Sequence, residues 1–234
     1  MSFGDHYSQA TLFWNSMSPV ERDHIVGAFS FELGKCNSPA VRERMLGNLA
    51  EVDAELVSRV ADALGMPAPG GSPSSDAGAS AALSILPEAP GPVGGRTVGV
   101  LVGPGVDGRG AESLRTALEA AGLSVYVIAP KGGRVEAKRG TLDVDRSVLT
   151  TDSVEYDALV VAGGDSAAEL AADPWTAVNL GEAFRHHKTI GAWGEGSGVL
   201  DALGLTGPGI VTAASATKTF AKDLITAIGW HRHW

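Results

Sequence analysis

The sequence has 234 residues, a formal charge of −9 and a single cysteine, Cys36, so it can form neither an internal disulfide nor a cysteine-built zinc site. An acidic chain of this kind does not suit nucleic acid or an anionic membrane surface, because both require a basic face. We expect a cytoplasmic protein, since the sequence has no apolar run long enough to span a bilayer and its first residues lack the basic region of a signal peptide.

Residues 1–65 are predicted to form a short all-helical segment. Ser18-Pro19-Val20-Glu21 has the pattern of a capping box with proline at the first helical position. Asn37-Ser38-Pro39 starts a further helix, whose apolar period continues to Gly65, the expected cap. Residues 10–14 are expected to form a short apolar helix. These helices carry more apolar surface than they can bury alone, which predicts that something else covers them.

Residues 66–95 are predicted to be a flexible linker. Proline, glycine, serine and alanine dominate this stretch, and Asp76 and Glu88 are its only charged residues. The apolar patch at residues 82–86 could lie as an extended strap on a neighbouring surface.

From Arg96 onward, strand and helix patterns alternate, which predicts a doubly wound α/β domain over residues 96–234 with a parallel sheet. The run Val98 to Val102 is continuously apolar, as expected for a strand buried on both faces. Further strands are expected at 123–129, 158–161, 189–193 and 210–212, and helices at 114–121, 166–171, 177–186, 198–203 and 218–228. Residues 131–149 are predicted to form a small antiparallel excursion.

The turn after the first strand, Gly103-Pro104-Gly105-Val106-Asp107-Gly108, has the spacing of a dinucleotide-binding loop. In such loops the positions of Gly103, Gly105 and Gly108 let a pyrophosphate approach the backbone at a helix N-terminus. Asp107 would place a negative charge at the phosphates, and the second strand ends without the acid that binds ribose. We therefore assign no cofactor here and keep an anion- or nucleotide-binding module as an alternative.

The stretch Thr189-Ile190-Gly191-Ala192-Trp193-Gly194-Glu195-Gly196-Ser197 predicts a strand that turns sharply into a helix, the geometry of a nucleophile elbow. The elbow position is Gly194, which has no side chain, and Ser197 is predicted to be a helix cap. No metal is assigned, because no carboxylate or cysteine is spaced to form a metal site with the histidines His186, His187, His231 and His233.

The pattern Gln9-Ala10…Leu12-Phe13-Trp14…Ser18-Pro19…Glu21, with Phe31-Glu32-Leu33 after it, resembles the C-terminal helical region of large-subunit heme catalases. The later stretches Gly95-Arg96-Thr97-Val98, Asp107-Gly108, Ile190-Gly191-Ala192-Trp193-Gly194 and the terminal His-Arg-x-Trp also match. The resemblance covers essentially the whole chain. It implies that residues 96–234 are the flavodoxin-like appended domain of those catalases, similar to the PfpI-like, class I glutamine amidotransferase superfamily.

The resemblance also implies which chemistry is missing. The heme site of the family uses a distal His and Asn and a proximal Tyr, and Tyr7, Tyr126 and Tyr156 do not match that context. In PfpI-like enzymes a Cys stands at the elbow, followed by a His, with an acid from the first turn. Gly194 and Glu195 replace the first two, and Asp107 matches the acid, so we regard all three positions as vestigial and assign no catalytic residue.

The leading hypothesis is thus a non-catalytic structural and assembly part of a heme catalase whose parent dismutates hydrogen peroxide under oxidative stress, with chaperone-like holding of unfolding clients implied by the resemblance. Its expected partners are the heme-catalase core and neighbouring subunits, with homo-oligomer formation through residues 9–65. The sequence corresponds either to a piece of such a parent or to a free-standing relative. The rival hypothesis is a PfpI-like hydrolase or small-aldehyde enzyme that uses another residue, such as Glu195 or Asp107.

Overall fold

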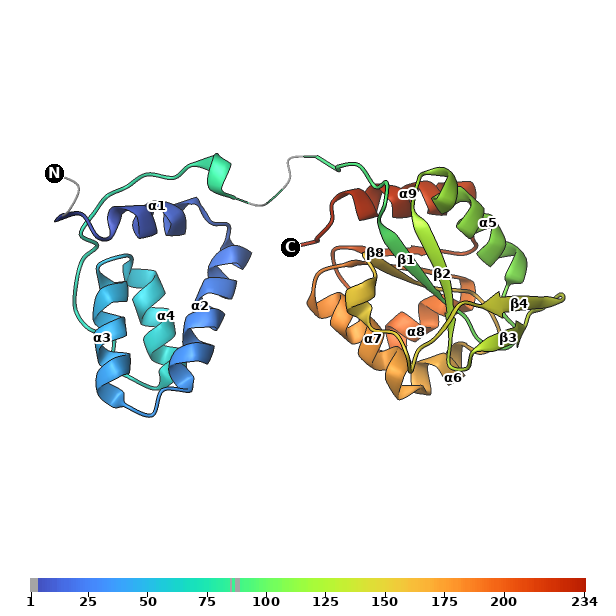
Figure 1. Cartoon of the computed structure of the whole chain (residues 1–234), viewed down its shortest axis with the longest axis horizontal. Coiled ribbons are helices and arrows are strands. Elements are labelled where there is room, and N and C mark those ends of the chain that lie inside the picture. The colour runs from blue at the N-terminus through green and yellow to red at the C-terminus, as the bar shows by residue number, and fades with distance from the viewer. Residues whose placement is uncertain (1–3, 85, 87–88) are drawn as a thin grey trace. The chain divides into compact units, whose positions relative to one another are not determined.

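The computed structural model describes residues 4–84, 86 and 89–234, and it forms two compact units, Met1–Leu86 and Pro87–Trp234 (Figure 1). Each unit has its own hydrophobic core. Three residues of the predicted linker, Ile85, Pro87 and Glu88, lie outside the described residues, and Ile85 is also part of the predicted strap.

The first unit, which we call unit 1, contains α1 (Ser8–Ser16), α2 (Pro19–Gly34), α3 (Pro39–Ala50), α4 (Ala54–Leu64) and the short turn η2 (Ala81–Leu83). The predicted capping box is confirmed, since Ser18 Oγ accepts from the Glu21 amide and the Glu21 carboxylate accepts from the Ser18 amide at 2.7 Å. The predicted cap at Gly65 is confirmed by its left-handed backbone, with φ at 64°. No helix in the described part of the chain is long and apolar enough to cross a membrane.

The continuous helix expected between Pro39 and Gly65 is wrong, because the chain breaks at residues 51–53. Asp53 has an extended backbone, and its carboxylate accepts from the Leu56 amide at 3.0 Å, so it starts a new helix. The carbonyl of Val52 accepts from the Thr11 hydroxyl at 3.0 Å. The break lets α3 and α4 pack side by side around the buried Trp14.

Part of the segment predicted to be a linker is hydrogen-bonded to the helices of unit 1. The Ser74 amide donates to the carbonyl of Glu51 at 2.9 Å, and the Asn15 side chain donates to the carbonyl of Ala77 at 2.6 Å. The Ser80 amide donates to Ser16 Oγ at 2.9 Å. A run of glycine, serine and alanine is thus held against a folded surface through its backbone, although its side chains offer little to pack.

The second unit, unit 2, is built on a six-stranded sheet with the order β5-β2-β1-β6-β7-β8, and every pairing within it is parallel. The predicted doubly wound fold is confirmed. The strands are β1 (Thr97–Leu101), β2 (Ser124–Ala129), β5 (Arg146–Ser147), β6 (Ala158–Val161), β7 (Thr189–Trp193) and β8 (Ile210–Ala213). The predicted antiparallel excursion is the hairpin of β3 (Gly133–Glu136) and β4 (Thr141–Val144), and β5 at the sheet edge was not expected.

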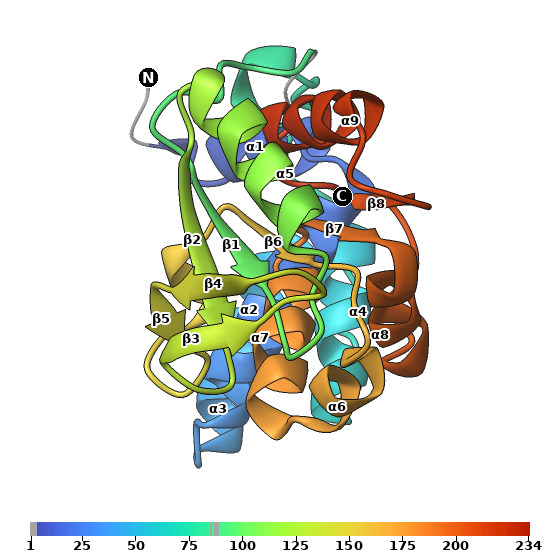
Figure 2. The same cartoon turned by 90° about the vertical axis from the view of Figure 1, so that its right-hand side faces the viewer.

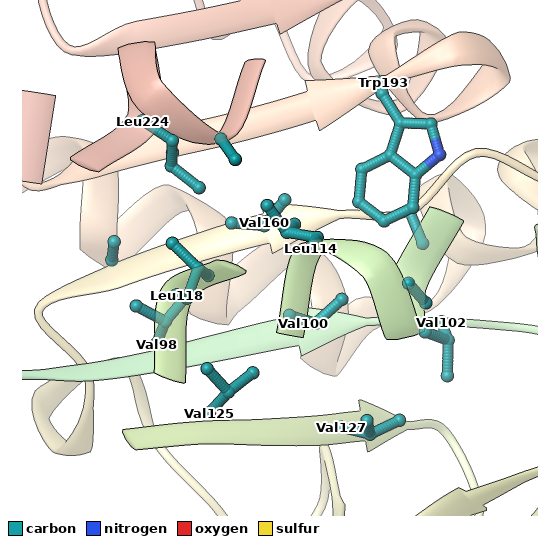
Figure 3. Packing of buried hydrophobic residues seen from close by; sticks show 14 of the residues in the cluster. Val98, Val100, Val102, Leu114, Leu118, Val125, Val127, Val160, Trp193 and Leu224 are labelled. Carbon is teal, nitrogen blue, oxygen red and sulfur yellow. The ribbon is translucent and has the colours of Figure 1, made fainter. Parts of the chain in front are cut away.

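Helices cover both faces of the sheet (Figure 2). On one face lie α5 (Gly108–Ala120) and α9 (Lys218–Gly229), and on the other lie α6 (Ala167–Ala172), α7 (Pro174–Arg185) and α8 (Ser197–Ala202). Figure 3 shows the first face, where valines of three neighbouring strands meet Leu114, Leu118 and Leu224. Alternate residues of one strand serve the two cores, since Val100 belongs to the first and Leu101 to the second.

We predict that Leu118→Ala lowers the free energy of unfolding of unit 2 by about 3 kcal/mol, because Leu118 is fully buried and its loss leaves a cavity. Leu149→Ala makes the same chemical change at a side chain that is 63% exposed, so it should cost less than about 0.5 kcal/mol. Urea unfolding of both variants measures the difference. Equal losses would mean that this face is not the core of the unit.

Candidate functional site

The candidate site lies at the carboxyl edge of the sheet, between β1 and β6. The chain passes from β1 to β2 on one side and from β6 to β7 on the other, so the strand order reverses between β1 and β6. In open α/β sheets ligands bind at such a switch point, outside the carboxyl ends of the strands. The turn 102–107 and the glycines that follow β6 meet there.

The glycine-rich turn has little room or free hydrogen-bonding capacity for a phosphate. The Gly105 amide donates to the carbonyl of Glu136 at 2.7 Å, and the Gly108 amide donates to the carbonyl of Val106 at 2.8 Å. A side-chain carbon at Gly103 would meet Ser166 Oγ at 2.2 Å, so the turn packs directly on the loop after β6. These glycines permit close backbone packing, and an incoming pyrophosphate would have to displace existing hydrogen bonds.

Asp107 is the N-cap of α5. Its carboxylate accepts from the Gly110 amide at 3.1 Å, and its own amide donates to the carbonyl of Gly163 at 2.7 Å. A carboxylate at this position satisfies an amide of the first helical turn and interacts favourably with the helix dipole. Asp107 therefore has a complete structural role at the place where an anionic ligand would bind.

The elbow after β7 has the backbone of a nucleophile elbow. Gly194 lies in the left-handed region with φ at 55°, and a side-chain carbon there would lie 3.6 Å from the carbonyl oxygen of Ala214 and 3.7 Å from Gly163 Cα. These are ordinary contact distances, so the geometry has room for a side chain that the sequence does not supply. Gly163 therefore lies between the two candidate positions: its carbonyl accepts from the Asp107 amide, and its Cα lies next to Gly194.

Lys138, which the sequence analysis did not single out, joins the acids of this edge. Its Nζ lies 3.2 Å from Asp165 Oδ1 and 3.6 Å from Glu195 Oε1. The hydrogen bond to Asp165, with the charges of Asp165 and Glu195, raises the pKa of Lys138. Lys138 follows β3, and the amide of Lys138 donates to the carbonyl of Val106 at 2.9 Å. Only this long-range pairing brings it to the site, so no local signal could have found it. All three side chains are well exposed, and such pairs contribute little to stability.

Other candidate nucleophiles and bases are not brought to the elbow. His187 precedes β7 and so lies at the amino edge of the sheet, where its ring packs on Trp234 and its Nδ1 lies 3.0 Å from the carbonyl of His233. The prediction that Ser197 caps a helix is wrong, because Ser197 is the first residue of α8 and Gly196 is its N-cap. Cys36 belongs to unit 1, beyond the end of α2.

Within the described ranges, no group of three or more His, Cys, Asp or Glu side chains could hold a metal ion. The indole N–H of Trp193 is buried beside Gly163 and makes no hydrogen bond to the described residues. An N–H in this state costs about 1–3 kcal/mol. The Trp193 N–H is therefore a buried donor without a partner among the described residues, next to the turn at Gly194.

Two family models match the chain. The model described as the C-terminal domain found in long catalases matches residues 94–234, and the model described as catalase-related immune-responsive matches residues 1–64.

Curated relatives match the same regions. Catalase HPII of Mycobacterium avium is 38% identical over 252 residues, and the match covers 100% of this chain and 36% of that protein. Catalase-2 of Bacillus subtilis is 39% identical over 239 residues, covering 100% of this chain and 34% of that protein. Catalase-1 of Neurospora crassa is 34% identical over 198 residues, and the match covers 82% of this chain and 27% of that protein. The chain thus spans about a third of the length of the curated relatives it matches.

We predict that esterase, protease and aldehyde-converting activities of the purified chain stay at background, and that Asp107→Asn and Glu195→Gln leave them there, because the elbow supplies no nucleophile. Asp107→Asn should also leave the free energy of unfolding within about 0.5 kcal/mol, since asparagine caps helices as well as aspartate. Model-substrate assays and urea unfolding check both. A robust activity that either substitution abolishes would contradict a vestigial site.

Proposed function

The chain belongs to the family of long catalases, as their C-terminal domain, and from that premise we propose that it is a non-catalytic structural and assembly part of such a catalase. In this proposal residues 1–65 are the end of the catalase helical region and residues 66–95 are a linker. Residues 96–234 are the appended flavodoxin-like, PfpI-like domain. The parent would use heme to dismutate hydrogen peroxide in the cytoplasm, and this part would stabilise its assembly.

The observation that carries the proposal is an apolar cleft on unit 1. It has a volume of about 370 Å³ and is lined by Ala10, Phe13, Trp14, Ile25, Ala28, Phe29, Leu49, Val52 and Leu56. Phe13 at its rim is 47% exposed, and Phe31 on the neighbouring helix α2 is 65% exposed. Uncovered apolar surface of this kind marks a contact with another protein surface. The heme core, a neighbouring subunit and an unfolding client would each cover it, the last as a chaperone-like second role.

The tyrosines of this chain do not support a heme site of the kind that the family uses, in which a tyrosine is the axial ligand. A heme iron needs an axial ligand that faces an open pocket. Each tyrosine is already engaged: Tyr7 donates to Asn48 at 3.1 Å, Tyr156 lies 2.7 Å from the Thr151 hydroxyl in the core, and Tyr126 has the Arg146 guanidinium 4.3 Å from its ring centre. These contacts support a chain that binds no heme of its own.

We predict that the purified chain shows no Soret band and no oxygen release from hydrogen peroxide, even when it is expressed with excess heme precursor. The reason is that each of its three tyrosines already contacts another side chain and none matches the heme-site pattern of the family. An absorption spectrum and an oxygen electrode measure the two properties. Stoichiometric heme with turnover would overturn the proposal.

We predict that the chain self-associates through residues 9–65, and that residues 96–234 alone form a folded monomer, because unit 2 has its own two-sided core. Phe13→Ser should weaken association at least tenfold, since it places a polar group in the apolar cleft. Val154→Ser, at an 82% exposed apolar side chain of unit 2, is the matched control and should have no effect.

Light scattering over a range of protein concentrations measures the self-association constants of the chain and of both variants, and the mass of residues 96–234 alone. If the full chain is a monomer, or if the deletion unfolds residues 96–234, the helices are not an assembly surface and the proposal is wrong.

A further inference from the structure

Charged residues gather at the amino edge of the sheet, opposite the candidate site. Arg96, Asp157 and Lys188 each immediately precede one of three neighbouring strands, β1, β6 and β7. Because parallel strands start at the same edge, these side chains come together there. Arg232, after α9, joins them, since its charge interacts with those of Arg96, Asp157 and Lys188.

The cluster is short of negative charge. Three cations surround one carboxylate, an excess of two positive charges in a chain whose formal charge is −9. One oxygen of Asp157 accepts from the Thr97 amide at 2.9 Å, and its single charge is shared among the three cations. Arg232 donates through one nitrogen to the carbonyl of His231 at 2.8 Å and forms no ion pair with the described residues.

Burial disfavours the charged form of two of the cations, Lys188 and Arg232. Burial lowers the pKa of Lys188, as does the charge of Arg232. Burial also lowers the pKa of Arg232; the charge of Asp157 opposes this effect and the charge of Arg96 adds to it. Lys188 Nζ donates to the carbonyls of Ser153 and Tyr156 at 2.6 and 2.7 Å, which leaves one N–H for a further partner.

The residues before these two cations end helices. Among the described residues, the non-glycine residues with positive φ are His187 at 54° and His231 at 65°. They follow the C-caps of α7 and α9, where a left-handed residue commonly ends a helix, and the Lys188 amide donates to the carbonyl of Ala183 at 3.0 Å. These two helix ends place Lys188 and Arg232 beside the same cavity.

Lys188 and Arg232 line a cavity of about 400 Å³, the size of a small-molecule site. Val154 and Val178 form an apolar lip, with 82% and 50% of their side chains exposed. Asp152 and Glu182 also line the cavity, and Glu182 is paired with Arg185 at 2.6 Å. Both acids disfavour an anion, so a ligand with one negative charge suits this lining better than a ligand with two.

We propose that this cavity binds a small organic monocarboxylate, with the carboxylate between Arg232 and Lys188 and the apolar part against Val154 and Val178. A carboxylate supplies the missing negative charge and accepts two N–H bonds from the planar guanidinium. The site is independent of the proposed assembly role and lies at the edge opposite the vestigial elbow.

The test is a titration of the full chain with isobutyrate, followed by amide chemical shifts, with isobutyramide as the neutral molecule of the same shape. We expect saturable shifts at Ser153, Asn179 and Lys188 with isobutyrate, with a dissociation constant in the millimolar range, and none with isobutyramide. Arg232→Gln should weaken binding at least tenfold, because it removes a charge-assisted pair of hydrogen bonds. Arg232→Lys, which keeps the charge but not the two parallel N–H donors, should weaken binding less than Arg232→Gln does.

Arg109→Gln is the matched control, since Arg109 is exposed, lies at the start of α5 at the opposite edge of the sheet and does not line the cavity. Unchanged amide spectra of the free variants show that they are folded. Several results would overturn the proposal: no saturable shift, equal binding of isobutyramide, binding unaffected by Arg232→Gln, or equal binding of inorganic phosphate at the same ionic strength.

Discussion

The architecture of unit 2 depends on the burial of its central parallel strands on both faces. β6 is buried at every position, and β1 is buried from its second residue onward. A strand of this kind cannot carry a polar side chain within its length without leaving that group unpaired. Helices must therefore cover both faces, and every residue that could bind or react is confined to the two edges where the strands begin and end.

The two edges meet this constraint in different ways. At the carboxyl edge, glycines bring backbone against backbone, and Asp107 and Lys138 satisfy their charges within the chain. At the amino edge, the buried Lys188 and the partly buried Arg232 lie beside a cavity and have one carboxylate, Asp157, to share with Arg96. The carboxyl edge, at which α/β proteins usually bind ligands, is thus closed by its own hydrogen bonds. The amino edge has more cations than carboxylates in its cluster.

Sequence periodicity predicted most of the fold, because both-sided burial leaves a direct trace in runs such as Val98 to Val102. The break at Asp53 was missed because the residues on either side keep a common apolar period, so the end of one helix and the start of the next look continuous. The short strand β5 carries Arg146 and Ser147, which have no strand-like pattern. For the sites, Gly194 was identified because strand and turn adjoin in sequence. Lys138 and the amino-edge cluster were not, because Arg96, Asp157, Lys188 and Arg232 are distant in sequence and only strand pairing brings them together.

The left-handed backbone at Gly194 bears on how such a domain changes over time. The conformation that an elbow nucleophile requires is present, and the space above it is open to a side chain. The Cβ of a cysteine at this position would lie at ordinary contact distances from its neighbours, and the left-handed backbone would cost roughly 1–2 kcal/mol. A single replacement would therefore place a thiol on this backbone. In the resemblance to PfpI-like enzymes, Glu195 also stands where those enzymes have a histidine, so a thiol at position 194 alone would lack the neighbour that activates it.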